Sequence, residues 1–157
     1  DLKENIAVSD PYVKNMQVIV IKDSNKDTFT DTASLSGANL VAEAGSAGQS
    51  AIEADENLSQ ANLTTVTKQT DALLEIESGA SDAAVLDWTL AKSMIGEGTD
   101  FADLMMIDGV ELSVEEYGIG FRKGSDLCTE VNKIMAELVE DGTLPALAEK
   151  YGLSLAE

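Results

Sequence analysis

The chain has 157 residues, 44% of them hydrophobic and 25% charged, so it is long enough to fold as one globular domain around its own core. Its 29 acidic residues outnumber its 10 basic residues, and the net charge of −19 argues against nucleic acid as a partner. The absence of histidine excludes Ser-His-Asp and Cys-His catalysis and histidine metal sites, and the single cysteine, Cys128, excludes an intrachain disulfide.

The first elements are a turn, a strand and a loop. Asp10-Pro11-Tyr12 predicts a turn, because proline restricts the residue before it to extended geometry. Residues 16–21 are apolar except for Gln17, and this run predicts a strand. Residues 22–32 are polar and rich in aspartate and asparagine, which predicts a surface loop.

The middle of the chain alternates between short apolar runs and amphipathic stretches. The apolar runs predict strands at 40–42, 63–66, 83–86 and 104–107, and the stretches between them predict helices at 47–55, 69–78 and 88–95. This alternation predicts an α/β fold whose parallel sheet carries helices on both faces. Ligands of such sheets bind beyond the carboxyl ends of the strands.

The last part of the chain predicts a strand at 117–121 and then two helices. Ser125 or Asp126 can cap the first helix, and Gly142 ends it. The second helix covers 143–151 and tolerates Pro145 in its first turn. The first helix carries an apolar stripe with Cys128 on the same face, which predicts that the cysteine is buried; the stripe is Leu127, Val131, Ile134 and Leu138.

Two stretches at predicted strand ends have complementary chemistry. Gly45-Ser46-Ala47-Gly48 opens a helix with bare backbone N–H groups and a hydroxyl, and a helix N-terminus favours an anion. Asp87 supplies a carboxylate that suits an ammonium group. An α-amino acid carries both charges. The structural alternatives are a plain strand-to-helix turn at Gly45 and a helix N-cap at Asp87, where one carboxylate oxygen can serve each role.

Other polar and aromatic residues near these ends have simpler interpretations. On position alone, Gln69 is predicted to be a solvated residue of a first helical turn, and Trp88 is predicted to pack in the core rather than to line a cleft. The pairs Asp108/Glu111 and Glu115/Glu116 lack the spacing of metal ligands and are interpreted as solvated charge rather than as acid–base pairs.

Several motifs occur together in a fixed order along the chain. They are Val8-Ser9-Asp10-Pro11-Tyr12, Gln17-Val18-Ile19-Val20, Ala44-Gly45-Ser46-Ala47-Gly48, Ser78-Gly79-Ala80-Ser81-Asp82-Ala83 and Glu116-Tyr117-Gly118-Ile119-Gly120-Phe121-Arg122-Lys123-Gly124. This set resembles the extracellular solute-binding proteins of polar amino acid ABC transporters, which are family 3 and type II periplasmic binding proteins.

The resemblance implies a periplasmic-binding-protein-like fold with two lobes that close around the ligand. It assigns 1–16 and 122–157 to lobe one, 22–116 to lobe two, and 17–21 and 117–121 to two hinge strands. The first half of lobe one has no counterpart in this chain. An incompletely covered lobe one also predicts self-association through its exposed apolar stripe.

The resemblance further implies a binding protein and not an enzyme, without a cofactor, which captures a polar amino acid between its lobes and delivers it to a membrane permease. Its location would be extracellular or periplasmic, with a lipoprotein anchor in the full-length form. Gly45, Ser46 and Ala47 would bind the ligand α-carboxylate, Ala47 through its backbone alone. Asp87 would bind the ammonium group, and Gln69 would lie near the ligand.

Two alternative functions fit the same resemblance. One is a ligand-sensing domain of a larger receptor. The other is a dehydratase-like enzyme on the same fold, for which Asp87 and Lys68 are the only candidate acid–base residues in the cleft.

Overall fold

The computed structural model describes residues 5–156 and divides them into two compact units. Unit 1 comprises residues 5–15 and 115–156, and unit 2 comprises residues 16–114. The chain therefore passes from one unit to the other at Asn15–Met16 and at Val114–Glu115. Residues 1–4, which begin the predicted lobe-one segment 1–16, and Glu157, which ends the segment 122–157, lie outside the described residues. Within 5–156, no helix has the length and apolar character that crossing a membrane requires.

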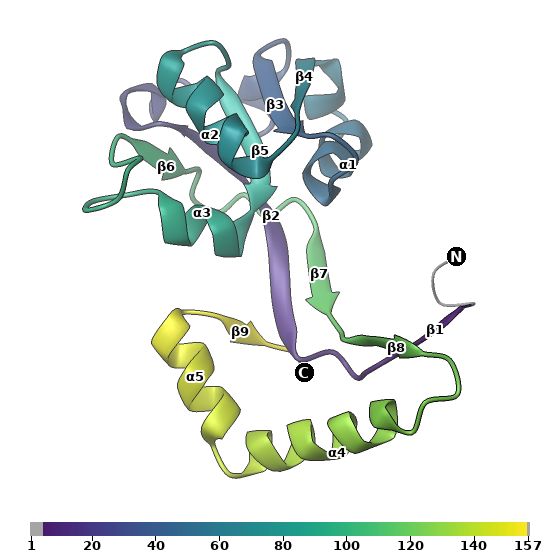
Figure 1. Ribbon diagram of the computed structural model, residues 1–157. Coiled ribbons are helices and arrows are strands. Elements are labelled where there is room, and N and C mark those ends of the chain that lie inside the picture. Colours follow the sequence, from purple (N-terminus) through teal and green to yellow (C-terminus); the bar gives the residue numbers. More distant parts are fainter. Residues whose placement is uncertain (1–4, 157) are drawn as a thin grey trace. The chain divides into compact units, whose positions relative to one another are not determined.

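Unit 2 is built on a mixed sheet whose strand order is β4-β3-β5-β2-β6 (Figure 1). The predicted parallel arrangement holds for β3, which is parallel to β4 and β5. It does not hold for β2, which is antiparallel to β5 and β6, because the segment from β2 to β3 contains only short 3-10 turns and no helical crossover. The strands are β2 (Val13–Lys22), β3 (Asn39–Glu43), β4 (Asn62–Val66), β5 (Ala83–Asp87) and β6 (Leu104–Met106).

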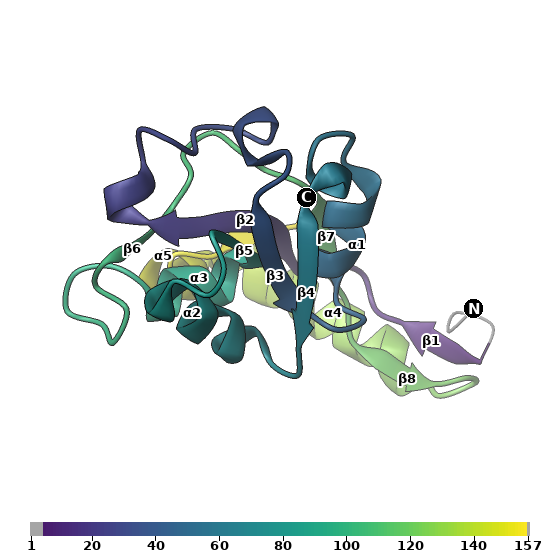
Figure 2. The same ribbon diagram turned by 90° about the horizontal axis from the view of Figure 1, so that it is seen from above.

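Helices cover both faces of this sheet, as the sequence predicts (Figure 2). Alternate residues of β2 point to opposite faces, so that Val18 and Val20 pack under α2 and α3, whereas Ile19 and Ile21 pack on the side of α1. All four are buried. The helices of unit 2 are α1 (Ala47–Ala54), α2 (Gln69–Ser78) and α3 (Trp88–Met94), with 3-10 turns η2 (Asp23–Asn25), η3 (Ala33–Leu35) and η4 (Leu58–Gln60).

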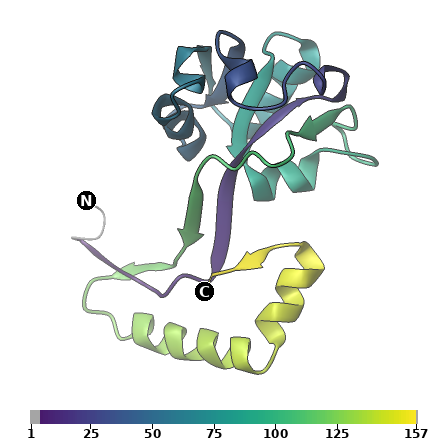
Figure 3. The ribbon, with the colours of Figure 1, turned by 180° about the vertical axis from the view of Figure 1, so that it is seen from behind.

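Unit 1 contains small strand pairings and two successive helices (Figure 3). The predicted strand at 117–121 is two strands, because the Ile119 N–H donates to the Ser9 hydroxyl and separates β7 from β8. β1 pairs with β8, β9 pairs with the first residues of β2, and β7 also pairs with β2. The elements are β1 (Ile6–Val8), β7 (Val114–Tyr117), β8 (Gly120–Arg122), α4 (Leu127–Glu140), α5 (Thr143–Tyr151) and β9 (Ser154–Leu155).

The apolar stripe of α4 is largely open to solvent. Leu127 is 62% exposed and Ile134 is 50% exposed, and α4 contains no buried residue. The predicted burial of Cys128 is therefore wrong, since this side chain is half-buried. The reason is that, within unit 1, α4 packs mainly on α5 and β8, which cover only part of its surface.

Candidate ligand-binding site

The carboxyl ends of three neighbouring strands meet at one edge of the unit 2 sheet. The register pairs Glu43 of β3 with Val66 of β4, and Leu40 of β3 with Ala83 of β5. Because the three strands run in the same direction, the segments that follow them emerge side by side. β3 is followed by the Gly45 turn, β4 by α2, which begins at Gln69, and β5 by α3, which begins after Asp87.

The Gly45 turn uses several of its polar groups to begin α1. Gly45 adopts a φ of 72°, which glycine tolerates without steric cost, and its N–H donates to the Gln49 side-chain oxygen at 2.8 Å. The Ser46 hydroxyl caps α1 by accepting from the Gln49 N–H at 3.1 Å. This arrangement resembles a capping box, so the structural interpretation of the turn is correct. In this cap the Ser46 hydroxyl acts as the acceptor, so its own O–H is not the donor. Ala47 contributes the N–H of the first helical position.

Asp87 is held by two glutamine side chains. Its Oδ1 accepts from Gln17 Nε2 at 2.6 Å, and its Oδ2 accepts from Gln69 Nε2 at 2.5 Å. The Asp87 N–H in turn donates to Gln69 Oε1 at 3.0 Å. Gln69 is therefore bound to Asp87 at both ends of its amide, which differs from the solvated residue predicted from its position.

The N-cap interpretation of Asp87 is only half correct. Asp87 occupies the N-cap position of α3, but within residues 5–156 its carboxylate makes no capping hydrogen bond to that helix. Its oxygens are turned toward the glutamines instead. Trp88, the first residue of α3, packs against the core cluster as predicted, and Lys92 Nζ lies 4.6 Å from its ring centroid.

An open hollow of about 360 Å³ lies beside Asp87. Of the predicted site residues, it brings together Asp87 and Gln69, whereas Gly45, Ser46 and Ala47 do not line it. Sequence reasoning did not assign a role to Gln17, although a lone amide inside the apolar run 16–21 was a usable indication. The lining residues are Glu43, Lys68, Gln69, Thr70, Asp87 and Leu90.

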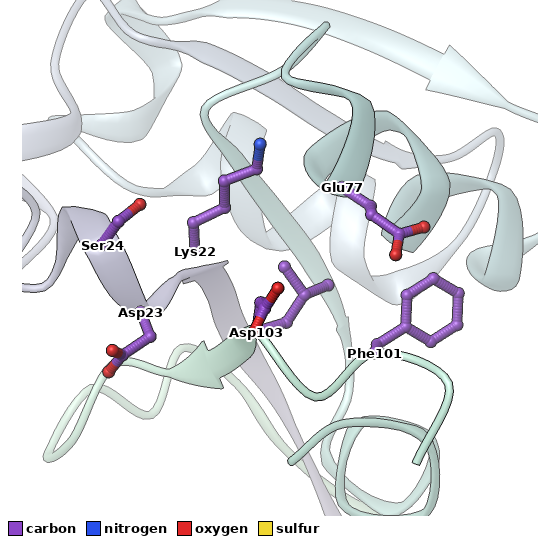
Figure 4. Close-up of a pocket in the computed structure, with 7 residues that line it drawn as sticks. Lys22, Asp23, Ser24, Glu77, Phe101 and Asp103 are labelled. Atoms are coloured by element: carbon purple, nitrogen blue, oxygen red, sulfur yellow. The ribbon is translucent and has the colours of Figure 1, made fainter. Parts of the chain in front are cut away.

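A second hollow, of about 290 Å³, lies at the opposite edge of the same sheet (Figure 4). Lys22 ends β2, and since β2 is antiparallel to β5, this residue lies near the amino end of β5. Figure 4 shows Lys22 and Ser24 on one side of the hollow and Glu77 with the Phe101 ring on the other. Because ligands of open α/β sheets bind at the carboxyl ends of the parallel strands, the edge with Asp87 is the better candidate.

Comparison with known proteins gives matches that span nearly the whole chain. The family model "Bacterial extracellular solute-binding proteins, family 3" matches residues 2–154. The L-cystine-binding protein TcyJ of Escherichia coli (strain K12) is 26% identical over 150 residues, which cover 95% of this chain and 54% of TcyJ. The chain thus spans about half the length of the curated relatives that it matches.

Solved structures give the same result and confirm the α/β, periplasmic-binding-protein-like fold. A mutant of ArgBP from T. maritima has a TM-score of 0.77 and 32% identity, with 95% of this chain and 62% of that chain covered. A substrate-binding protein of an amino acid ABC transporter from Streptococcus pneumoniae, bound to L-arginine, has a TM-score of 0.77 and 27% identity, with 99% and 64% covered.

Proposed function

The chain belongs to family 3 of the bacterial extracellular solute-binding proteins, and from this premise we propose that it is the substrate-binding component of an amino acid ABC transporter. The observation that carries the proposal is the Asp87 carboxylate, which two neutral amides hold at the carboxyl ends of three parallel strands. A carboxylate placed in this way suits the ammonium group that every α-amino acid carries.

The ligand would be a polar amino acid, bound at its common end by unit 2. Asp87 would accept hydrogen bonds from the α-ammonium group. The Ser46 hydroxyl and the Ala47 N–H would donate to the α-carboxylate at the start of α1, where the helix dipole favours an anion. Gly45 would shape the turn, and Gln69 would line the site and hold Asp87. The names of similar proteins make L-arginine and L-cystine the first candidates.

The two units would correspond to the two lobes of such a receptor. Unit 2 would be lobe two, and unit 1 would be a part of lobe one, since the similar proteins are considerably longer than this chain. The hinges would lie at Asn15–Met16 and Val114–Glu115. Residues 17–21, which the sequence assigned to a hinge, pair with β5 inside unit 2. A membrane permease as partner and a lipoprotein anchor in a full-length protein complete the proposal.

A calorimetric titration tests the assignment of Asp87. Wild-type protein would first be screened by thermal shift with the twenty common amino acids and L-cystine, because a ligand that binds the folded state raises its stability. We expect Asp87→Ala to weaken binding of the best amino acid more than tenfold, since a hydrogen bond to a charged group contributes roughly 1.5–3 kcal/mol. Asp103→Ala is the matched control, because Asp103 lies at the opposite edge of the sheet. Equal affinities in the two variants would reject the assignment.

A further inference from the structure

We propose that Gln17 is a positioning residue of the amino acid site, which fixes the Asp87 carboxylate close to the first turn of α1. The inference rests on the proposed function, because it concerns how Asp87 is prepared for an ammonium ligand. Gln17 and Asp87 face each other directly across β2 and β5. Their side chains are joined by a hydrogen bond of 2.6 Å from Gln17 Nε2 to Asp87 Oδ1.

The burial of Gln17 makes this hydrogen bond well suited to positioning. Gln17 is 1% exposed, so water cannot compete freely for its amide. Its backbone is also held on the side away from β5: the Gln17 N–H donates to Ser113 O at 2.9 Å, and the Leu112 N–H donates to Gln17 O at 3.0 Å. A side chain that leaves a fixed backbone and ends in a buried hydrogen bond has little freedom to move. It can therefore hold a functional carboxylate in one orientation.

The Gln17 side chain also lies close to the first turn of α1. A Cβ atom added at Gly48 would lie 3.2 Å from Gln17 Oε1 and 2.6 Å from Val85 O. The glutamine amide therefore fits in this space because residue 48 is glycine and carries no side chain. The amide lies between the first turn of α1, which we assign to the ligand carboxylate, and Asp87, which we assign to the ligand ammonium group.

The two glutamines orient Asp87 through neutral amides rather than through charged groups. A lysine or arginine in the place of Gln17 or Gln69 would orient Asp87 equally well, but it would also neutralise the carboxylate. Amides donate hydrogen bonds without a formal charge. The two glutamines thus orient both oxygens of Asp87 without placing a formal positive charge beside them.

The test is a double-mutant cycle on binding, with L-arginine and L-cystine as probes. Gln17→Met keeps the length and apolar stem of the side chain but removes the donor. We expect it to weaken binding about tenfold in the wild-type background and less than twofold in the Asp87→Ala background, because it acts only through Asp87. Gln60→Met, at an exposed residue of η4, is the matched control and should leave the affinity unchanged. Equal loss in both backgrounds would overturn the positioning role.

A second measurement on unliganded protein separates this inference from the proposed function. In wild-type protein, we expect an NMR signal of the Gln17 side-chain amide to carry the downfield shift of a proton bound to a carboxylate, and to lose it in Asp87→Ala. An amide signal that does not respond to Asp87→Ala would refute the inference even if amino acids bind. If neither probe nor any common amino acid binds the wild type, the proposed function fails and the ligand role of Gln17 fails with it.

Discussion

Gly48→Ala should destabilise unit 2, although the same change usually stabilises a helix. Gly48 lies in the first turn of α1, where alanine would gain at most about 0.5–1 kcal/mol from helix propensity. The new Cβ would lie 2.6 Å from the Val85 carbonyl oxygen, a distance that Cβ atoms essentially never show. Val85 is a buried backbone position in β5, so α1 must move instead. Overpacking of this kind costs roughly 1–3 kcal/mol, so the middle of the two ranges leaves a net loss of about 1 kcal/mol.

The single tryptophan makes this prediction easy to measure. Trp88 packs against the core of unit 2, so its fluorescence reports the unfolding of the unit that contains Gly48. Urea unfolding of wild type, Gly48→Ala and Ser50→Ala should show a lower midpoint for Gly48→Ala alone. Ser50 is an exposed residue of the same helix, and its change to alanine should shift stability by no more than about 0.5 kcal/mol. A Gly48→Ala protein as stable as wild type would refute the close-packing argument.

Two further predictions concern unit 1. The pKa of Asp141 lies below its ordinary value because the Thr143 hydroxyl and the Thr143 N–H donate hydrogen bonds to its carboxylate. The stability that Asp141 provides should therefore be present at neutral pH and be lost as the pH falls through the lowered pKa. The midpoint difference between wild type and Asp141→Ala, measured by urea unfolding from pH 7 downward, should shrink below about pH 4. The exposed Leu127 and Ile134 of α4 should promote self-association. The double variant Leu127→Lys/Ile134→Lys should therefore lower the mass measured by light scattering, whereas the control Thr129→Lys on the same helix should not. A monomeric wild type would contradict this expectation.

The local elements of this fold follow closely from the sequence. The helix predicted at 69–78 matches α2, because its buried residues Ala72, Leu73 and Ile76 have helical spacing and Gly79 ends it in the left-handed conformation. The helix predicted at 143–151 matches α5, which Gly152 ends in the same way. Both cases depend on interactions within about ten residues, and such interactions are what a sequence pattern records most directly.

Features that depend on distant contacts were less predictable. The stripe of α4 has the spacing of a buried helix face, yet none of its residues is buried and Leu127 and Ile134 are exposed, because burial depends on which elements cover them. The strand predicted at 117–121 is divided because Ser9, more than a hundred residues away in sequence, binds the Ile119 N–H. In the proposed site, the residue type of Asp87 identifies it as a candidate, but its glutamine partners come from β2 and α2, which are distant in sequence.

The direction of β2 connects the main error in the predicted topology with the residue that the sequence analysis missed. In a fully parallel sheet, the carboxyl end of β2, near Lys22, would lie at the same edge as the proposed ligand site. Because β2 is antiparallel to β5, that edge receives its earlier residues instead, and Gln17 pairs with Asp87 where β5 ends. Lys22 consequently lines the hollow at the other edge. The strand that enters unit 2 from Asn15–Met16 thus brings an amide beside the Asp87 carboxylate within two residues of its entry, a placement that no pattern of alternating strands and helices contains.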